Sequence, residues 1–185
     1  LILLPTLNGL KRKGINYRGV IYAGLMMTSS GPKVIEFNCR FGDPECQALM
    51  PLMGQEFGKI LQACALGQLE QAPNLSIRDK CSACIVIAAS GYPENPKKGD
   101  LIDIQLKENQ SLQLFHSGTK LNSDKKVISS GGRVLSVVAQ GDCFDNAFSL
   151  AYKGINKIYL EDMIYRSDIG HQVRDVPKIK ELSNK

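Results

Sequence analysis

Closely spaced turn signals constrain the fold of this 185-residue chain more than any other feature. Between residues 83 and 140, short apolar segments alternate with turn sequences rich in Gly, Pro, Asn and Asp. The pattern predicts a small β-rich region in which tight turns join the strands. The predicted strands cover residues 83–89, 101–106, 111–116, 126–130 and 133–140.

Helical patterns flank this region, so the predicted fold class is α+β. Apolar residues at helical spacing predict a helix over 142–157 with Asp142 as its N-cap, and another over 57–64 that stops at Gly67. The remaining predicted elements are the end of a helix over 6–14 and a hairpin of strands over 19–28 and 33–39. A polar stretch over 67–80 predicts a boundary between a first domain of residues 1–76 and a second of 77–171, followed by a polar tail of 172–185.

Charge and cysteine usage exclude several classes of protein. The net charge of +5 lies wholly in the first 35 residues, which hold five Lys or Arg and no acid, so no basic face for nucleic acid is expected. No apolar run approaches the roughly 18 residues of a membrane span. Six cysteines without a disulfide framework predict buried free thiols and a reducing, cytoplasmic environment.

The stretch from Val34 to Glu45 carries the strongest chemical signal. On a strand, Ile35 and Phe37 would point to the core while Glu36, Asn38 and Arg40 share the other face, with successive Cα atoms about 6.5 Å apart. A carboxylate beside an amide oxygen can both reach one hard cation such as Mg²⁺. A surface strand that happens to carry one acid, one amide and one base is the competing interpretation.

The residues after this pair offer groups for an anion and acceptors for an amine or a hydroxyl. Arg40 offers a planar fork for phosphate or carboxylate. Gly42 permits close backbone approach to a ligand, and Asp43 and Glu45 add acceptors for an amine or hydroxyl. Metal and arginine together imply phosphoryl transfer.

A family resemblance favours the functional interpretation. Residues 17–26 and 31–45 resemble the phosphoribosylamine–glycine ligases, also called glycinamide ribonucleotide synthetases, and so do 89–93, 115–119 and 131–135. The resemblance implies the C-terminal part of an ATP-grasp fold, followed by a small β-rich, barrel-like domain of the rudiment hybrid motif type. It also implies ligation of glycine to 5-phosphoribosylamine, in which ATP first converts the glycine carboxylate to an acyl phosphate, during purine biosynthesis.

The resemblance assigns roles to individual residues. Glu36 and Asn38 fall on the ligands of Mg²⁺ or Mn²⁺, and Arg40 falls on the catalytic arginine beside the transferring phosphoryl group and the carboxylate. The substrate-binding residues are expected to be Arg40, Gly42, Asp43, Glu45 and, for the ribose phosphate, Arg133. Asp43 is the expected contact to an amine. His116 is more simply interpreted as a packed or turn-stabilising histidine.

The chain begins at Leu1 rather than Met, which favours a piece of a longer protein. The resemblance implies that the N-terminal domain and most of the ATP-grasp region, with its adenine contacts, belong to that longer protein, and that the piece alone is inactive. Two alternatives stay open. The chain is a stand-alone, non-catalytic binding module, or it is part of another ATP-grasp enzyme such as a carboxylase subunit.

Overall fold

The computed structural model describes residues 1–173, and they form two compact units. Unit 1 comprises Leu1–Cys46 and Met53–Ile77, and unit 2 comprises Gln47–Leu52 and the described residues from Arg78 onward. Residues 47–52, which the sequence prediction places in the first domain, therefore group with unit 2. Nearly all of the predicted tail of 172–185 lies outside the described residues.

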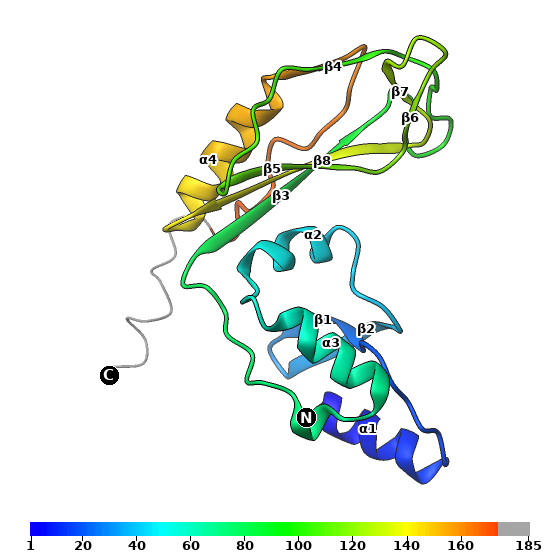
Figure 1. The fold of residues 1–185 in the computed structure, drawn as a ribbon, viewed down its shortest axis with the longest axis vertical. Helices are drawn as coiled ribbons and strands as arrows, with labels where there is room; N and C mark the ends of the chain where they lie inside the picture. The colour runs from blue at the N-terminus through cyan, green and yellow to red at the C-terminus, as the bar shows by residue number, and fades with distance from the viewer. Residues whose placement is uncertain (174–185) are drawn as a thin grey trace. The chain divides into compact units, whose positions relative to one another are not determined.

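Unit 1 contains one hairpin and two longer helices (Figure 1). Its elements are α1 (Leu3–Arg12), β1 (Tyr22–Thr28), β2 (Gly31–Asn38), α3 (Phe57–Leu66) and the 3₁₀ turn η2 (Leu69–Gln71), while the short helix α2 (Glu45–Leu49) begins at its edge. The α3 helix ends at Gly67, which adopts φ 73° in the left-handed region, as the sequence predicted. The antiparallel pairing of β1 with β2 confirms the predicted hairpin.

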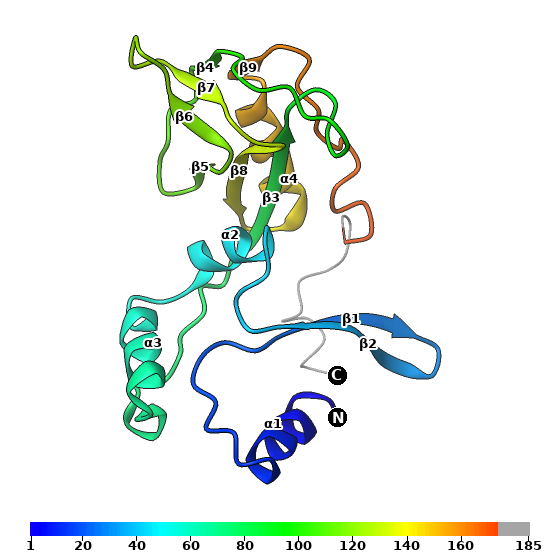
Figure 2. The same cartoon turned by 90° about the vertical axis from the view of Figure 1, so that its right-hand side faces the viewer.

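The apolar residues of the hairpin are not where the sequence placed them. Ile35 and Phe37 were expected to point to a core, but their exposed fractions are 64% and 46%. Among the described residues, β1 and β2 form a two-stranded sheet of their own (Figure 2), so no further strand extends it. A register shift between Gly24 and Leu25 also interrupts the alternation that the prediction assumed.

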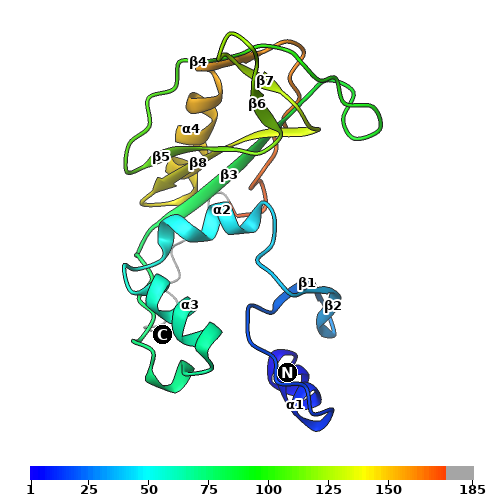
Figure 3. The same cartoon turned by 45° about the vertical axis from the view of Figure 1, so that its right-hand side comes forward.

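Unit 2 is built around a three-stranded antiparallel sheet in the order β3-β8-β5. Helix α4 packs along this sheet (Figure 3), and shorter strands form separate pairs, β4 with β9 and β6 with β7. The elements are η1 (Met50–Leu52), β3 (Cys81–Ala88), β4 (Ile102–Ile104), β5 (Leu112–His116), β6 (Thr119–Leu121), β7 (Val127–Ser129), β8 (Arg133–Gly141), α4 (Phe144–Ile155) and β9 (Ile158–Leu160). The class is α+β as expected, but the described strands form no closed barrel, since β3 and β5 remain edges of the main sheet.

The N-terminus of α4 differs from the prediction. Cys143, not Asp142, occupies the N-cap position, and it makes no side-chain cap hydrogen bond. The Asp142 carboxylate instead forms an ion pair with Lys80, which is 62 residues away in the sequence. A long-range partner therefore replaces the local capping role.

The cysteines also differ from the prediction in their burial. All six are free thiols, but Cys39 is exposed and the other five are only partly buried. Most of them lie near the ends of strands and helices, where side chains are only partly covered. Among residues 1–173, no helix has the length and apolar character needed to cross a membrane.

The core of unit 2 predicts a large stability effect. Ile85 on β3 has no exposed surface and belongs to the cluster between the sheet and α4. Ile85→Ala is expected to lower the free energy of unfolding by about 3 kcal/mol, because it removes buried methyl groups and leaves a cavity. Thermal unfolding followed by circular dichroism measures the loss. Leu121→Ala, at a side chain 63% exposed, is the control and should change stability by less than about 0.5 kcal/mol. Equal melting temperatures for Ile85→Ala and Leu121→Ala would contradict this packing.

Candidate functional site

The carboxyl end of β2 presents two adjacent oxygen-bearing side chains. The Nδ2 group of Asn38 donates a hydrogen bond to Oε1 of Glu36 at 3.0 Å, so the two side chains lie on the same side of the strand. Across the hairpin, Tyr22 pairs with Asn38 and Gly24 pairs with Glu36. Cross-strand partners share a face, so these four residues form one polar patch.

This pair fits a hard divalent cation. The bond uses the amide nitrogen of Asn38 and one oxygen of Glu36. The other oxygen of each side chain, Oδ1 of Asn38 and Oε2 of Glu36, is therefore not used by this bond and can serve as a metal ligand. Oxygen ligands suit Mg²⁺ and Mn²⁺, and Mg²⁺ commonly takes few protein ligands and completes its shell with water and phosphate. No cluster of three or more His, Cys, Asp or Glu residues with metal-binding geometry occurs within residues 1–173. Within these residues, Glu36 and Asn38 are therefore two candidate ligands rather than a complete coordination shell.

Gly24 contributes to this patch, although no sequence motif singles it out. A Cβ built on Gly24 would lie 3.0 Å from Cγ of Glu36, which is closer than ordinary packing allows. The missing side chain lets Glu36 extend across β1. Only the register of the hairpin shows this relation, because the two residues are 12 positions apart.

Arg40 lies beyond the strand rather than on it. The β2 strand ends at Asn38, so Arg40 does not continue its face as the sequence analysis expected. Its side chain is exposed, and its Nη1 donates to the carbonyl oxygen of Phe41 at 2.7 Å. This bond uses one of the five N–H donors of the guanidinium, so the group retains donors for an anion.

Residues 41–45, here called the substrate loop after the role expected from the sequence, fold back on themselves. The amide of Cys46 donates to the carbonyl oxygen of Gly42 at 3.0 Å, and Gly42 is buried. The Glu45 carboxylate accepts a hydrogen bond from the hydroxyl of Tyr22, with 3.2 Å between Oε1 and the phenolic oxygen. Asp43, in the middle of this segment, is exposed. Sequence reasoning missed Tyr22, whose partner lies 23 residues away.

The electrostatics of the patch follow from these contacts. Burial, and then the neighbouring carboxylates of Glu45 and Glu36, raise the pKa of Tyr22 above its ordinary value. Burial and the charge of Asp43 raise the pKa of the Cys46 thiol. Tyr22 is therefore a protonated donor, and Cys46 a neutral thiol, at physiological pH.

The two remaining sequence candidates lie in unit 2. Arg133 begins β8, is partly buried and makes interactions within the described part of the chain. His116 ends β5, and its Nδ1 lies 3.0 Å from the hydroxyl of Thr119, which confirms the expected turn-stabilising role. The structure thus brings together Glu36 with Asn38 and Gly42 with Glu45, whereas Arg133 belongs to a separate unit.

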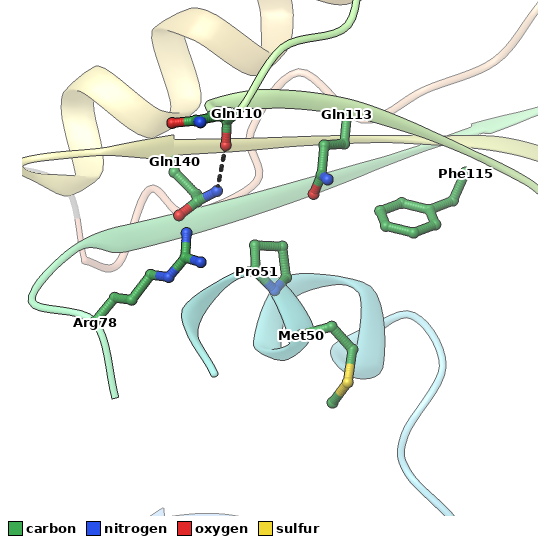
Figure 4. Close-up of a pocket in the computed structure, with 7 residues that line it drawn as sticks. All are labelled: Met50, Pro51, Arg78, Gln110, Gln113, Phe115 and Gln140. Atoms are coloured by element: carbon green, nitrogen blue, oxygen red, sulfur yellow. Dashed lines mark hydrogen bonds between the residues drawn. The ribbon is translucent and has the colours of Figure 1, made fainter. Parts of the chain in front are cut away.

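Unit 2 also contains a polar pocket of about 420 Å³ that none of the sequence candidates lines. Figure 4 shows the Arg78 guanidinium directed toward Gln140, whose Nε2 donates to the carbonyl oxygen of Gln110 at 2.7 Å. The other lining residues are Met50, Pro51, Gln113 and Phe115. Its polar groups are carboxamides and one guanidinium, without an acid or nucleophile among them, so it offers no evident catalytic group.

Comparison with known families gives two matches. The model of the C domain of phosphoribosylglycinamide synthetase matches residues 82–172. The model of the ATP-grasp (A) domain of the same enzyme matches residues 1–46. The two matches follow one another along the chain. The ATP-grasp match includes Glu36, Asn38 and Arg40, and the C-domain match includes Arg133.

Individual relatives agree with these matches. The phosphoribosylamine–glycine ligase of Synechocystis is 47% identical over 173 residues, covering 92% of this chain and 41% of the relative. A bifunctional purine biosynthetic protein of Schizosaccharomyces pombe is 40% identical, covering 97% of this chain and 22% of the relative. The crystal structure of the phosphoribosylamine–glycine ligase of Thermotoga maritima superposes with a TM-score of 0.77 at 31% identity, over 88% of this chain and 40% of that one. The chain spans about two fifths of the length of the ligases it matches.

Proposed function

The chain belongs to the phosphoribosylglycinamide synthetase family, and from this we propose that it forms the C-terminal part of an ATP-dependent ligase that joins glycine to 5-phosphoribosylamine. The observation that carries the proposal is the match of two domains of one enzyme, in order, to residues 1–46 and 82–172. We assign residues 1–76 to the ATP-grasp part and 77–171 to the C-terminal domain. The adenine contacts belong to the part of the ligase that precedes these residues.

Glu36 and Asn38 would hold the divalent cation in this ligase. Mg²⁺ or Mn²⁺ bound there would neutralise negative charge on the phosphates of ATP. The hydrogen bond between the two side chains supports this role, because it fixes both of them at the same end of β2. The cation would be Mg²⁺ in the first instance, since few protein oxygens supplemented by phosphate and water suit its preferences.

Arg40 and Asp43 would bind the two ends of glycine. The guanidinium of Arg40 can pair with the glycine carboxylate and then stabilise the negative charge that develops as the phosphoryl group is transferred to it. The exposed carboxylate of Asp43 can accept hydrogen bonds from the ammonium group of the same molecule. The amine of phosphoribosylamine then attacks the acyl carbon, and phosphate leaves. Arg133 would bind the ribose phosphate.

The reaction would take place in the cytoplasm. All six cysteines are free thiols, which is typical of a reducing compartment. The substrates are small, charged metabolites, and they would reach the site by diffusion.

Product formation by the full-length protein tests the proposal. We expect ADP to form from ATP only when both glycine and phosphoribosylamine are present, and radiolabelled glycine to appear in a phosphorylated product in equal amount. Reactions that omit one substrate are the controls. ADP formation that needs neither substrate, or that needs bicarbonate instead of glycine, would contradict the assignment and favour a different ATP-grasp enzyme.

A further inference from the structure

One oxygen of the Glu45 carboxylate is hydrogen-bonded to β1, and the other lies close to Gly42. Its Oε1 accepts from the Tyr22 hydroxyl at 3.2 Å. Its Oε2 lies over Gly42, where an added Cβ would come within 2.3 Å of it. A carboxylate whose role is to bind a substrate amine would need neither the Tyr22 hydrogen bond nor the close approach to Gly42.

We propose that Tyr22 and Glu45 form a clamp that fastens the substrate loop to β1, and that both act as positioning residues for Asp43 rather than as contacts of the substrate. The inference rests on the proposed function, since the substrate loop binds glycine only in that ligase. It reassigns Glu45 from a ligand of the substrate to a support of the loop.

The clamp lies next to the metal pair. Tyr22 is the cross-strand partner of Asn38, and Gly24 is that of Glu36. A Cβ on Gly24 would lie 3.0 Å from Glu36 Cγ and 3.7 Å from a ring carbon of Tyr22, so the tyrosine ring and the glutamate side chain occupy the same face of the hairpin. Fastening Glu45 to Tyr22 therefore ties the loop to the strand pair that carries the metal ligands.

Gly42 takes on a different role in this arrangement. The sequence suggested that its lack of a side chain admits a ligand, but the atoms nearest to an added Cβ belong to Glu45. A side chain at position 42 would displace the Glu45 carboxylate from the Tyr22 hydroxyl. Gly42→Ala should therefore reproduce the defect of losing the clamp.

Kinetics of the full-length ligase test the clamp. We expect Tyr22→Phe and Glu45→Ala each to raise the KM for glycine roughly five- to tenfold, the size expected for one lost hydrogen bond, with a smaller change in kcat. The KM for glycine of the double variant should be no higher than that of either single variant, because both substitutions remove the same bond. Tyr159→Phe, at an exposed tyrosine of unit 2, is the matched control and should leave the KM unchanged.

A conservative variant separates support from substrate contact. Glu45→Gln keeps an acceptor for the Tyr22 hydroxyl but removes the charge, so a clamp predicts that it regains most of the glycine affinity that Glu45→Ala loses. If Glu45 paired directly with the substrate ammonium, Gln and Ala would be equally harmful. That result, or additive losses in the double variant, would overturn the inference.

A readout without turnover separates this inference from the proposed function. In the full-length protein, Tyr22→Phe and Glu45→Ala should each lower the melting temperature, and the double variant should lower it no further, because both remove the same hydrogen bond. A wild-type protein that fails to make the ligase product refutes the proposed function but leaves this pattern intact. Additive losses in the double variant, or no loss in either single variant, refute the clamp even in an active ligase.

Discussion

Glu36→Ala is expected to reduce the turnover of the full-length ligase about a thousandfold, which corresponds to ~4 kcal/mol of lost transition-state stabilisation. Glu36 supplies the only formal negative charge of the pair on β2, since Asn38 is neutral. Removing the carboxylate takes away the electrostatic attraction for the cation as well as a ligand atom. It also removes the acceptor that holds the Asn38 amide at 3.0 Å, so the second ligand loses its orientation.

Two measurements check this expectation. Turnover is followed as a function of Mg²⁺ concentration, and Mn²⁺ binding is followed by electron paramagnetic resonance with ATP present. Lys33→Ala, at an exposed position of the same strand, is the control and should behave as the wild type. The turnover of Asn38→Ala should lie between those of Glu36→Ala and Lys33→Ala, because the charge of Glu36 remains. Normal turnover and normal Mg²⁺ dependence in Glu36→Ala would remove the basis for a metal site on β2.

Local signals explain which parts of the fold were predictable. Gly67 ends α3 because glycine adopts positive φ at low cost, and apolar residues at helical spacing predicted α4 with Ala147 and Ile155 buried. The β1–β2 hairpin followed from its turn residues. Each of these features depends on residues within about ten positions, so the sequence pattern contains the information.

Non-local contacts explain what was missed. Asp142 was predicted to cap α4, but its ion pair with Lys80 depends on a residue brought close by the pairing of β3 with β8. The strand β9 was also missed, and it is defined by its pairing with β4, in which Leu160 lies opposite Ile102. The β-rich, barrel-like domain that the resemblance implied forms without closing among the described strands, because closure depends on pairing between edge strands that no local signal specifies.

The candidate site shows the same division. The period of a strand was enough to place Glu36 beside Asn38, and the structure shows these side chains in contact. The same period failed for Arg40, because β2 ends two residues earlier. The pairing of Tyr22 with Glu45 depends on the return of the chain after Gly42, which the sequence does not reveal. The functional roles of these residues remain predictions.

Arg40 gives the second large prediction. We expect Arg40→Ala to lower the kcat of the full-length ligase about 10³-fold, because a charged group positioned for the transition state typically contributes several kcal/mol. The effect should fall on kcat more than on the KM for ATP, since the negative charge that Arg40 meets develops during transfer to the glycine carboxylate.

Arg40→Lys separates the charge of this group from its shape. Lysine keeps the positive charge but not the planar fork that pairs with two oxygens at once, so it should recover only a small part of the lost kcat. Added guanidinium should partly restore Arg40→Ala, because the small cation can occupy the vacated position, and added ammonium should do so less well. Single-turnover formation of ADP measures the chemical step, with Arg12→Lys in α1 as the control. Full activity in Arg40→Lys would show that charge alone suffices, and full activity in Arg40→Ala would remove Arg40 from the reaction.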